Sequence, residues 1–476
     1  TLATPGAGGR PGALGFIGNG PGRIGGNFQD AWKKGFAPRS GIAWQANPKT
    51  VIRTSVGIYY ANAGNSASPP SAGFGNTPSF SSPDGYTPLY NLATGTFPQG
   101  FSRPPVMNPS FLNGQAITYI PWTGTRLPQT LDWTFGIQRE IGRDLSVEAS
   151  YLGSRSTHLG FSTNYNYMPL SGLQYGNLLL SAITTPAAIA AGFTPPYPAF
   201  VTQKGANTVY QSLRPNPQYT SVTTGGTFFG GSFGGGVADP VGQQKFNSLQ
   251  IKANKRVSRG LTLFGFFTWM KIFNLATDQY PGSRLFQLDG SPAATFSFSW
   301  AYSLPFGKGG MSTGSRPLNA VVSDWKVNGF VKYNSGSAMG VSGASGSLGQ
   351  VGYGQRANAV LGVSPYGVTN PRDFNPATSK FLNSAAFSPS TGFNFGKLAP
   401  SLSWVRGFWG KQESLTVGRL FKIKERLTFD FSLDATNPFN FHRWGNPTTN
   451  LLSAAFGTVS SVSAGRTVQV NGALKF

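Results

Sequence analysis

Residues 466–476 read RTVQVNGALKF, and this C-terminal stretch decides the class of fold. Counted back in steps of two, one series is apolar apart from glycine: Phe476, Leu474, Gly472, Val470 and Val468. The intervening residues are polar apart from Ala473. Successive side chains of a β-strand point to opposite faces, so this pattern predicts a strand with one apolar and one polar face. Both the edge strand of a soluble sandwich and a membrane-spanning strand have this alternation, and the rest of the chain distinguishes them.

The same alternation recurs along the whole chain and predicts an all-β, antiparallel protein. Among the clearest examples are LDWTFGI (131–137) and LTFDFSLDA (427–435), whose alternate residues are large and apolar. The predicted strands lie near 36–46, 50–60, 129–141, 145–153, 245–256, 261–272, 293–304, 322–334, 412–421, 427–436 and 465–476.

The connections between these strands alternate in length. The odd ones are short, at 46–49, 142–144, 257–260 and 422–426, with one exception at 305–321. The even ones are long, at 61–128, 154–244, 273–292, 335–411 and 437–464. Alternate connections of an up-and-down sheet lie at the same end, and outer-membrane barrels have short periplasmic turns and long extracellular loops. The sequence therefore predicts an antiparallel transmembrane β-barrel of outer-membrane type.

The two faces of the predicted strands support a barrel. Four carboxylates occupy positions on the polar face, where a dry core would not accept them unpaired: Asp132, Glu148, Asp430 and Asp434. We expect them to face a polar lumen; the alternative is that they face bulk solvent on a half-exposed sheet. On the last strand, the lipid-facing side chains of membrane insertion are predicted to be Val468, Val470, Leu474 and Phe476.

Composition excludes several classes of protein. Only 11% of the 476 residues are charged, against roughly 25% in a typical soluble domain. Cysteine is absent and the two histidines have no partner at metal-ligand spacing, so we expect no cofactor and no metal. No apolar run approaches the ~18 residues that a membrane-spanning helix needs. The net charge of +23 is scattered, which favours anionic lipid headgroups or solutes over nucleic acid.

The sequence contains no set of residues with the spacing of a catalytic or metal-binding motif, so we expect that the protein is not an enzyme. GSRSTH (153–158) has serines near His158 but no carboxylate to orient it. SLDATN (432–437) offers Asp434 and Asn437 to calcium, although a structural role is favoured. Ordinary loop contacts are favoured for HRW (442–444), and turn formation for TNYNYM (163–168).

Several segments together resemble the later part of the Oar-like TonB-dependent outer-membrane transporters, which are abundant in acidobacteria and their relatives. The resemblance runs in order over nearly the whole chain and rests on residues 36–61, 131–159, 247–271, 303–309 (SLPFGKG) and 434–450 (DATNPFNFHRWGNPTTN). It implies a barrel of about 22 strands with a plugged lumen. It also implies import in which an energy-coupling protein of TonB type pulls on an N-terminal plug. The terminal Phe476 resembles the signal that barrel-assembly machinery reads.

The chain departs from that family pattern, since about eleven strands are predicted and no plug or partner-binding box is found. We therefore expect the C-terminal half of a longer barrel, with 1–35 as an extracellular loop remnant and 36–476 as barrel strands. Residues that would couple transport to energy are missing. The expected partners are outer-membrane lipids, barrel-assembly machinery, an unknown cargo and, through a plug, the coupling protein. The alternative functions are a surface structural or adhesive protein and a passive porin formed by a smaller closed barrel.

Overall fold

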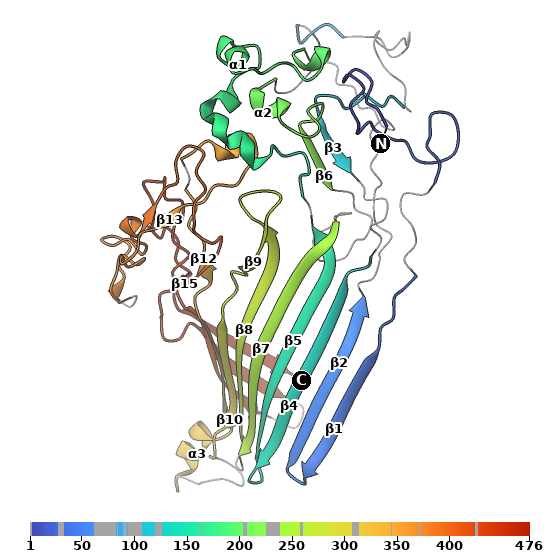
Figure 1. Ribbon diagram of the computed structural model, residues 1–476. Coiled ribbons are helices and arrows are strands. Elements are labelled where there is room, and N and C mark those ends of the chain that lie inside the picture. Colours follow the sequence, from blue (N-terminus) through green and yellow to red (C-terminus); the bar gives the residue numbers. More distant parts are fainter. Residues whose placement is uncertain are drawn as a thin grey trace.

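A computed structural model (Figure 1) describes most of the chain. The described residues are 2–26, 33–60, 82, 84–88, 93, 107–119, 126–161, 163–202, 207–224, 239–257, 260–306, 314–343, 345–370, 373–423 and 427–476. Most of the predicted loop 61–128 and the glycine-rich stretch 225–238 lie outside them.

Eleven long strands pair antiparallel in one sheet, in the order β1-β2-β4-β5-β7-β8-β10-β11-β16-β17-β18. Their bounds are β1 Arg39–Asn47, β2 Thr50–Tyr60, β4 Gln129–Ile141, β5 Leu145–Phe161, β7 Asp239–Val257, β8 Leu261–Thr277, β10 Ala294–Ser303, β11 Trp325–Asn334, β16 Gly410–Lys422, β17 Thr428–Thr436 and β18 Thr467–Lys475. A twelfth strand, β9 (Arg284–Leu288), pairs with the end of β8. All eleven predicted strands are thus present, in the predicted up-and-down order.

The structure corrects several boundaries. The strand predicted to start at 245 starts at Asp239, and the strand predicted to end at 272 ends at Thr277, because they pair with the end of β5 and with β9. The strand predicted to start at 322 starts at Trp325, because helix α3 (Arg316–Val322), with proline in its first turn, occupies the preceding residues. The strand predicted to end at 153 continues to Phe161, since β7 pairs with it as far as Asp239. One extra residue is accommodated there by a β-bulge, at which His158 has a φ of 57°.

The remaining elements are short and lie in the connections. The strands are β3 Ala116–Tyr119, β6 Ser221–Thr224, β12 Ala338–Met339, β13 Asn358–Ala359, β14 Phe387–Ser388 and β15 Leu402–Arg406. The helices are α1 Pro186–Ala190 and α2 Val209–Ser212, with 3₁₀ segments η1 Leu170–Leu180, η2 Pro198–Phe200, η3 Leu348–Val351 and η5 Ser384–Ala386. None of the helices in the described part of the chain is long and apolar enough to cross a membrane.

Register keeps one face of the sheet apolar from strand to strand. One cross-strand row consists of Trp44, Ile52, Ile137, Ala149, Ile251, Phe267, Phe296 and Tyr333. The neighbouring row on the opposite side includes Arg53, Gly136, Ser150, Gln250 and Thr268. We call these two sides the apolar face and the polar face. A shift of one residue at any strand would exchange them, so the alternation enforces the register.

The two ends of the sheet differ as the connection lengths predicted. Figure 1 shows tight turns at the lower end and the long connections gathered at the upper end, the loop end. The sheet curls, so that the C-terminal strands pass behind β4 and β5 in this view. The exception is the connection between β10 and β11, which places α3 at the turn end.

The long connections fold into a packed structure, which we call the loop cap: the described parts of 163–224, 278–293, 335–409 and 437–466. One buried cluster joins 335–409 to 437–466 and includes Phe381, Leu382, Val405 and Phe456. A second joins 163–224 to 335–409 through residues such as Met168 and Leu348. The largest fully buried side chains of the described residues lie here and not between the strands, because the sheet has no second layer against which to pack.

Candidate functional site

The polar face has a hollow of about 230 Å³ over the half of β2, β4, β5 and β7 that lies towards the turn end. Its polar lining is Arg53, Thr134, Gln138, Glu148, Ser150, Gln250 and Lys252. We call this hollow the charged groove. Each lining side chain comes from an alternate residue of its strand, so the period of the strand places them all on one face.

Pairing within the charged groove holds its side chains in place. Arg53 Nη1 donates to Gln138 Oε1 over 3.0 Å. Lys252 Nζ lies 3.8 Å from Glu148 Oε1, which also accepts a hydrogen bond from the Ser150 hydroxyl at 2.9 Å. The charged groove therefore contains two cations and one carboxylate, together with amide donors and acceptors. Such a lining suits a solute that carries hydroxyl, amide or carboxylate groups.

The structure places the four predicted carboxylates on the polar face, but they do not come together. Asp132 lies opposite Gly57 and Ser154, whereas Glu148 lies opposite Gln138, six residues further along β4 towards the turn end. Asp430 and Asp434 lie on β17, separated from β5 by five strands of the sheet path. The carboxylates therefore do not form one site, and only Glu148 lines the charged groove.

The pair on β17 is fully engaged in local contacts. Asp430 Oδ2 accepts from Lys475 Nζ at 2.9 Å. Asp434 accepts from the Thr416 hydroxyl at 2.6 Å, from Ser432 at 3.2 Å and from Asn471 at 2.5 Å. These bonds tie β16, β17 and β18 together on the polar face, which explains how a carboxylate is tolerated beside the last strand.

Sequence reasoning missed the cations and amides of the charged groove, Arg53, Gln138, Gln250 and Lys252, because it considered only carboxylates on that face. A signal was present, since these residues lie in the polar register of their strands. Which of them come together, however, depends on cross-strand register, which the alternation of one strand does not give.

The apolar face is exposed over much of the sheet. The predicted insertion residues lie on it: Val468, Val470, Leu474 and Phe476 are 52%, 65%, 55% and 97% exposed. On β1 and β4, Trp44 and Phe135 are 60% and 48% exposed. An apolar surface of this extent on the described residues is not found on soluble monomers and indicates contact with a lipid or protein partner.

Two tryptophans cover glycines on this face. Trp133 lies opposite Gly153, and Trp300 lies opposite Gly329, on adjacent strands. A Cβ added to either glycine would come within 2.1 or 1.9 Å of the indole. The indoles thus protect strand backbone that would otherwise be exposed, and they smooth the apolar face.

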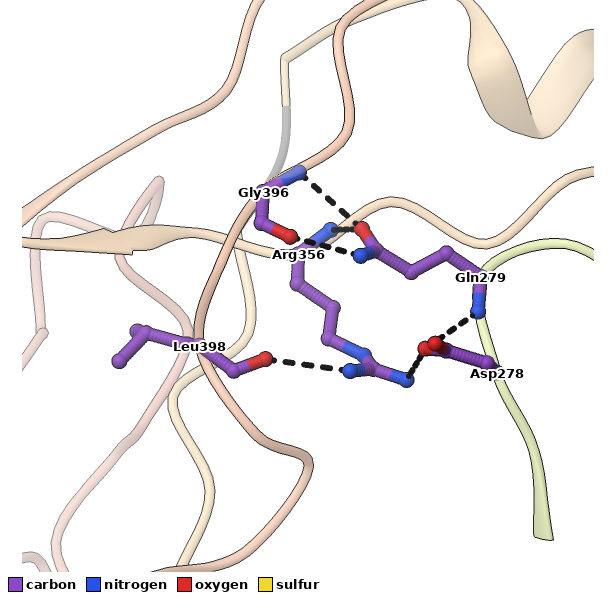
Figure 2. A network of polar contacts seen from close by, with 5 residues as sticks. All are labelled: Asp278, Gln279, Arg356, Gly396 and Leu398. Carbon is purple, nitrogen blue, oxygen red and sulfur yellow. Dashed lines mark hydrogen bonds and ion pairs between the residues drawn. The ribbon is translucent and has the colours of Figure 1, made fainter. Parts of the chain in front are cut away.

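A polar network joins the connection after β8 to the 335–409 part of the loop cap, as Figure 2 shows. The Gln279 amide donates to the Gly396 carbonyl at 2.6 Å and accepts from the Arg356 and Gly396 backbone N–H groups at 2.9 and 3.1 Å. The Arg356 guanidinium pairs with Asp278 and donates to the Leu398 carbonyl at 3.2 Å. One side chain therefore satisfies three backbone groups of two separate segments.

We expect Gln279→Ala to loosen this attachment by about 1–3 kcal/mol, because it leaves partly buried backbone groups without partners. Limited proteolysis of the folded protein in detergent measures the effect as faster cleavage within 278–293 and 391–399. Gln355→Ala is the control, since Gln355 donates to two carbonyls from an exposed position. Equal protection of the wild type and the Gln279 variant would show that the network does not hold the loop cap.

Two further groups connect segments of the loop cap. The buried Tyr353 hydroxyl donates to the Met168 carbonyl, and burial raises the pKa of Tyr353. Arg214 lies 4.2 Å above the Tyr210 ring and donates to the Thr220 carbonyl. Burial lowers the pKa of Arg214 to about 10, so the guanidinium stays charged at neutral pH. The loop cap is therefore a packed structure at the loop end of the sheet.

The other motifs have structural roles. The Asn437 side chain bonds both backbone groups of Phe441, at 3.0 and 2.9 Å, while Asp434 is held by its three neighbours. Asn166 of TNYNYM donates to the carbonyls of Asn216 and Tyr219. Across the described ranges, no group of three His, Cys, Asp or Glu side chains is placed to hold a metal ion.

Comparison with known proteins gives the class to which this fold and its two faces belong. A family model described as "Outer membrane beta barrel domain" matches residues 2–469, and the chain belongs to this family. The protein is therefore an all-β outer-membrane barrel protein, located in the outer membrane. In this family the apolar face is the lipid-facing face and the polar face lines the interior.

Among solved structures, the chain is similar to the outer membrane transporter YddB from Escherichia coli, at 10% identity and a TM-score of 0.42 over 92% of this chain and 40% of that one. It is also similar to the ferric-catecholate import receptor Fiu from E. coli K12, at 10% identity and a TM-score of 0.36 over 92% and 34%. A third similar structure is the FrpB iron transporter from Neisseria meningitidis, at 10% identity and a TM-score of 0.32 over 92% of this chain and 38% of that one. The chain thus spans two fifths or less of the length of these proteins. No curated protein matches it.

Proposed function

We propose that this chain forms barrel strands of an outer-membrane transporter of the TonB-dependent, Oar-like type. The polar face lines the path of a cargo across the membrane, and the loop cap selects that cargo outside the cell. The observation that carries this proposal is the charged groove, which lies on the interior face of a sheet whose other face is lipid-exposed. Eleven strands correspond to half of a 22-stranded barrel, the size of plugged transporters.

The chemistry of the charged groove limits the chemical class of cargo that it can bind. Its two cations and single carboxylate suit a neutral or weakly anionic solute, and its carboxamides suit hydroxyl or peptide groups. An oligosaccharide or a peptide fits this lining. Energy coupling would require a plug and a coupling protein of TonB type, as in transporters of that class. The proposal assigns no enzymatic activity to the chain.

The test compares cells that lack the gene with complemented cells, and measures uptake of a panel of labelled oligosaccharides and peptides. Two results together support energy-coupled import. Uptake of one of these classes is lost in the cells that lack the gene, and it is also lost in complemented cells when the proton-motive force is collapsed. A steady open conductance of the purified protein in a planar bilayer would instead indicate a passive porin. Unchanged uptake with lost surface attachment would indicate an adhesive protein.

For a transported cargo, we expect Arg53→Ala/Lys252→Ala to raise the half-saturation concentration of uptake at least tenfold. The reason is that a hydrogen bond to a charged group contributes about 1.5–3 kcal/mol. Lys326→Ala/Lys332→Ala is the matched control, because these lysines lie on the polar face of β11, away from the charged groove. An equal effect of the two double variants would show that charge on the interior face matters and that the groove does not.

A further inference from the structure

Three cations gather at the loop end of the apolar face. Arg155 on β5 lies directly opposite Lys245 on β7, and Asn247, two residues from Lys245, lies opposite Lys271 on β8. Lys245 and Lys271 are therefore diagonal neighbours on the same face. All three residues are exposed. We call these three residues the basic cluster.

Such an arrangement is unfavourable on its own, because like charges directly opposite each other destabilise a pair of strands. Lys245 lies 4.3 Å from the centre of the Phe286 ring, and Lys271 lies 5.6 Å from that of Trp269. Arg155 has no comparable ring contact, and within the described residues no ion pair involves any of the three. The basic cluster therefore has uncompensated positive charge that faces away from the interior.

The level of the basic cluster in the membrane follows from β7. Lys245 and Lys255 lie on the same face ten residues apart, and between them this face presents Asn247, Leu249, Ile251 and Ala253. Ten strand residues rise about 34 Å, or about 25 Å along the membrane normal at the usual tilt, which is the height of the apolar band of an outer-membrane barrel. Lys245 and Lys255 thus mark the two boundaries of the apolar band. The basic cluster therefore lies at the level of the lipid headgroups, at the loop end of the sheet.

We propose that the basic cluster binds the phosphate groups of a phosphorylated glycolipid in the outer leaflet. A guanidinium pairs with phosphate through two parallel hydrogen bonds, and lysines add point charges from either side. The exposed Trp269 and Tyr151 lie just below the cluster on the same face, where they contact the glycolipid backbone and acyl chains. This inference rests on the proposed orientation, in which the loop end is extracellular, and not on the identity of the cargo.

The test measures binding of diphosphoryl lipid A to the full-length protein in detergent by native mass spectrometry. Each basic residue close to an anionic lipid surface strengthens binding about fivefold, so Arg155→Gln/Lys245→Gln should weaken it about 25-fold. Arg139→Gln/Lys255→Gln is the matched control, with one arginine and one lysine that are exposed on the same face at the turn end. The control should change binding less than twofold.

A second measurement separates binding from folding. Without lipid, the Arg155/Lys245 variant should unfold in detergent no earlier than the wild type, because it removes a repulsion. Three results would overturn the proposal: equal loss of binding in both double variants, equal binding of dephosphorylated lipid A, or tighter binding of phosphatidylglycerol. The last result would place the cluster in the phospholipid leaflet. These measurements do not involve cargo uptake. A result that overturns the lipid-binding proposal therefore leaves the transport proposal unaffected.

Discussion

Replacing Gly336 by alanine should open the part of the loop cap in which β12 and β15 pair. The added Cβ would lie 1.8 Å from the carbonyl oxygen of Gly407, and both groups belong to backbone that cannot rotate away. The two segments are also joined by hydrogen bonds from Gly407 N–H to the Ser337 carbonyl and from Arg406 to the Gly336 carbonyl, at 3.0 and 2.9 Å. We expect the stability of this region to fall by about 3 kcal/mol, which is the upper end of the range of destabilisation that overpacking of a core causes.

Hydrogen exchange of the folded protein in detergent measures this loss as reduced protection of 335–341 and 400–407, while the long strands stay protected. Gly340→Ala should have the same effect, since its Cβ would lie 2.0 Å from the Pro400 carbonyl oxygen. Gly349→Ala is the control, because nothing lies within 4 Å of its Cβ position. Unchanged protection in the Gly336 variant would mean that these segments are less closely packed than the structure has them.

Replacement of Arg443 by methionine should destabilise the protein by about 3–5 kcal/mol, because it leaves the carboxylate of Glu413 buried and unpaired. Glu413 lies opposite Val331, on the apolar face, yet its side chain is 0% exposed. The loop that follows β17 covers it, and Arg443 Nη2 donates to Glu413 Oε2 over 3.0 Å. A charged residue on the lipid-facing side is thereby kept out of the lipid.

Urea unfolding in detergent, followed by tryptophan fluorescence, measures this effect. Lys475→Met is the matched control, since the ion pair of Lys475 with Asp430 is 63% and 45% exposed and should contribute at most about 1 kcal/mol. The double variant Glu413→Gln/Arg443→Met should regain part of the loss, because the carboxylate is no longer charged. A midpoint for Arg443→Met equal to that of Lys475→Met would contradict a buried pair.

Much of the fold could be predicted from the sequence, for a local reason. Alternation within one strand depends on residues two positions apart, so LTFDFSLDA and RTVQVNGALKF already specify which side chains share a face. The lengths of the connections can also be read along the chain. They predicted that short turns lie at one end of the sheet and long loops at the other. The prediction was wrong at 322, where α3 continues the connection, because a proline-initiated helix turn depends on few residues and gives a weak pattern.

The interactions on which the two proposals and the Arg443 prediction depend were decided only by the tertiary structure. Arg155 lies opposite Lys245, 90 positions away in sequence, because β5 and β7 pair in one particular register. Glu413 is buried because a loop from beyond the next strand folds over it. The charged groove likewise needs four strands at once. The sequence by itself determined the strands, their apolar and polar faces, and the difference between the turn end and the loop end of the sheet. Contacts between distant strands and loops depend on register and packing, which no local pattern contains.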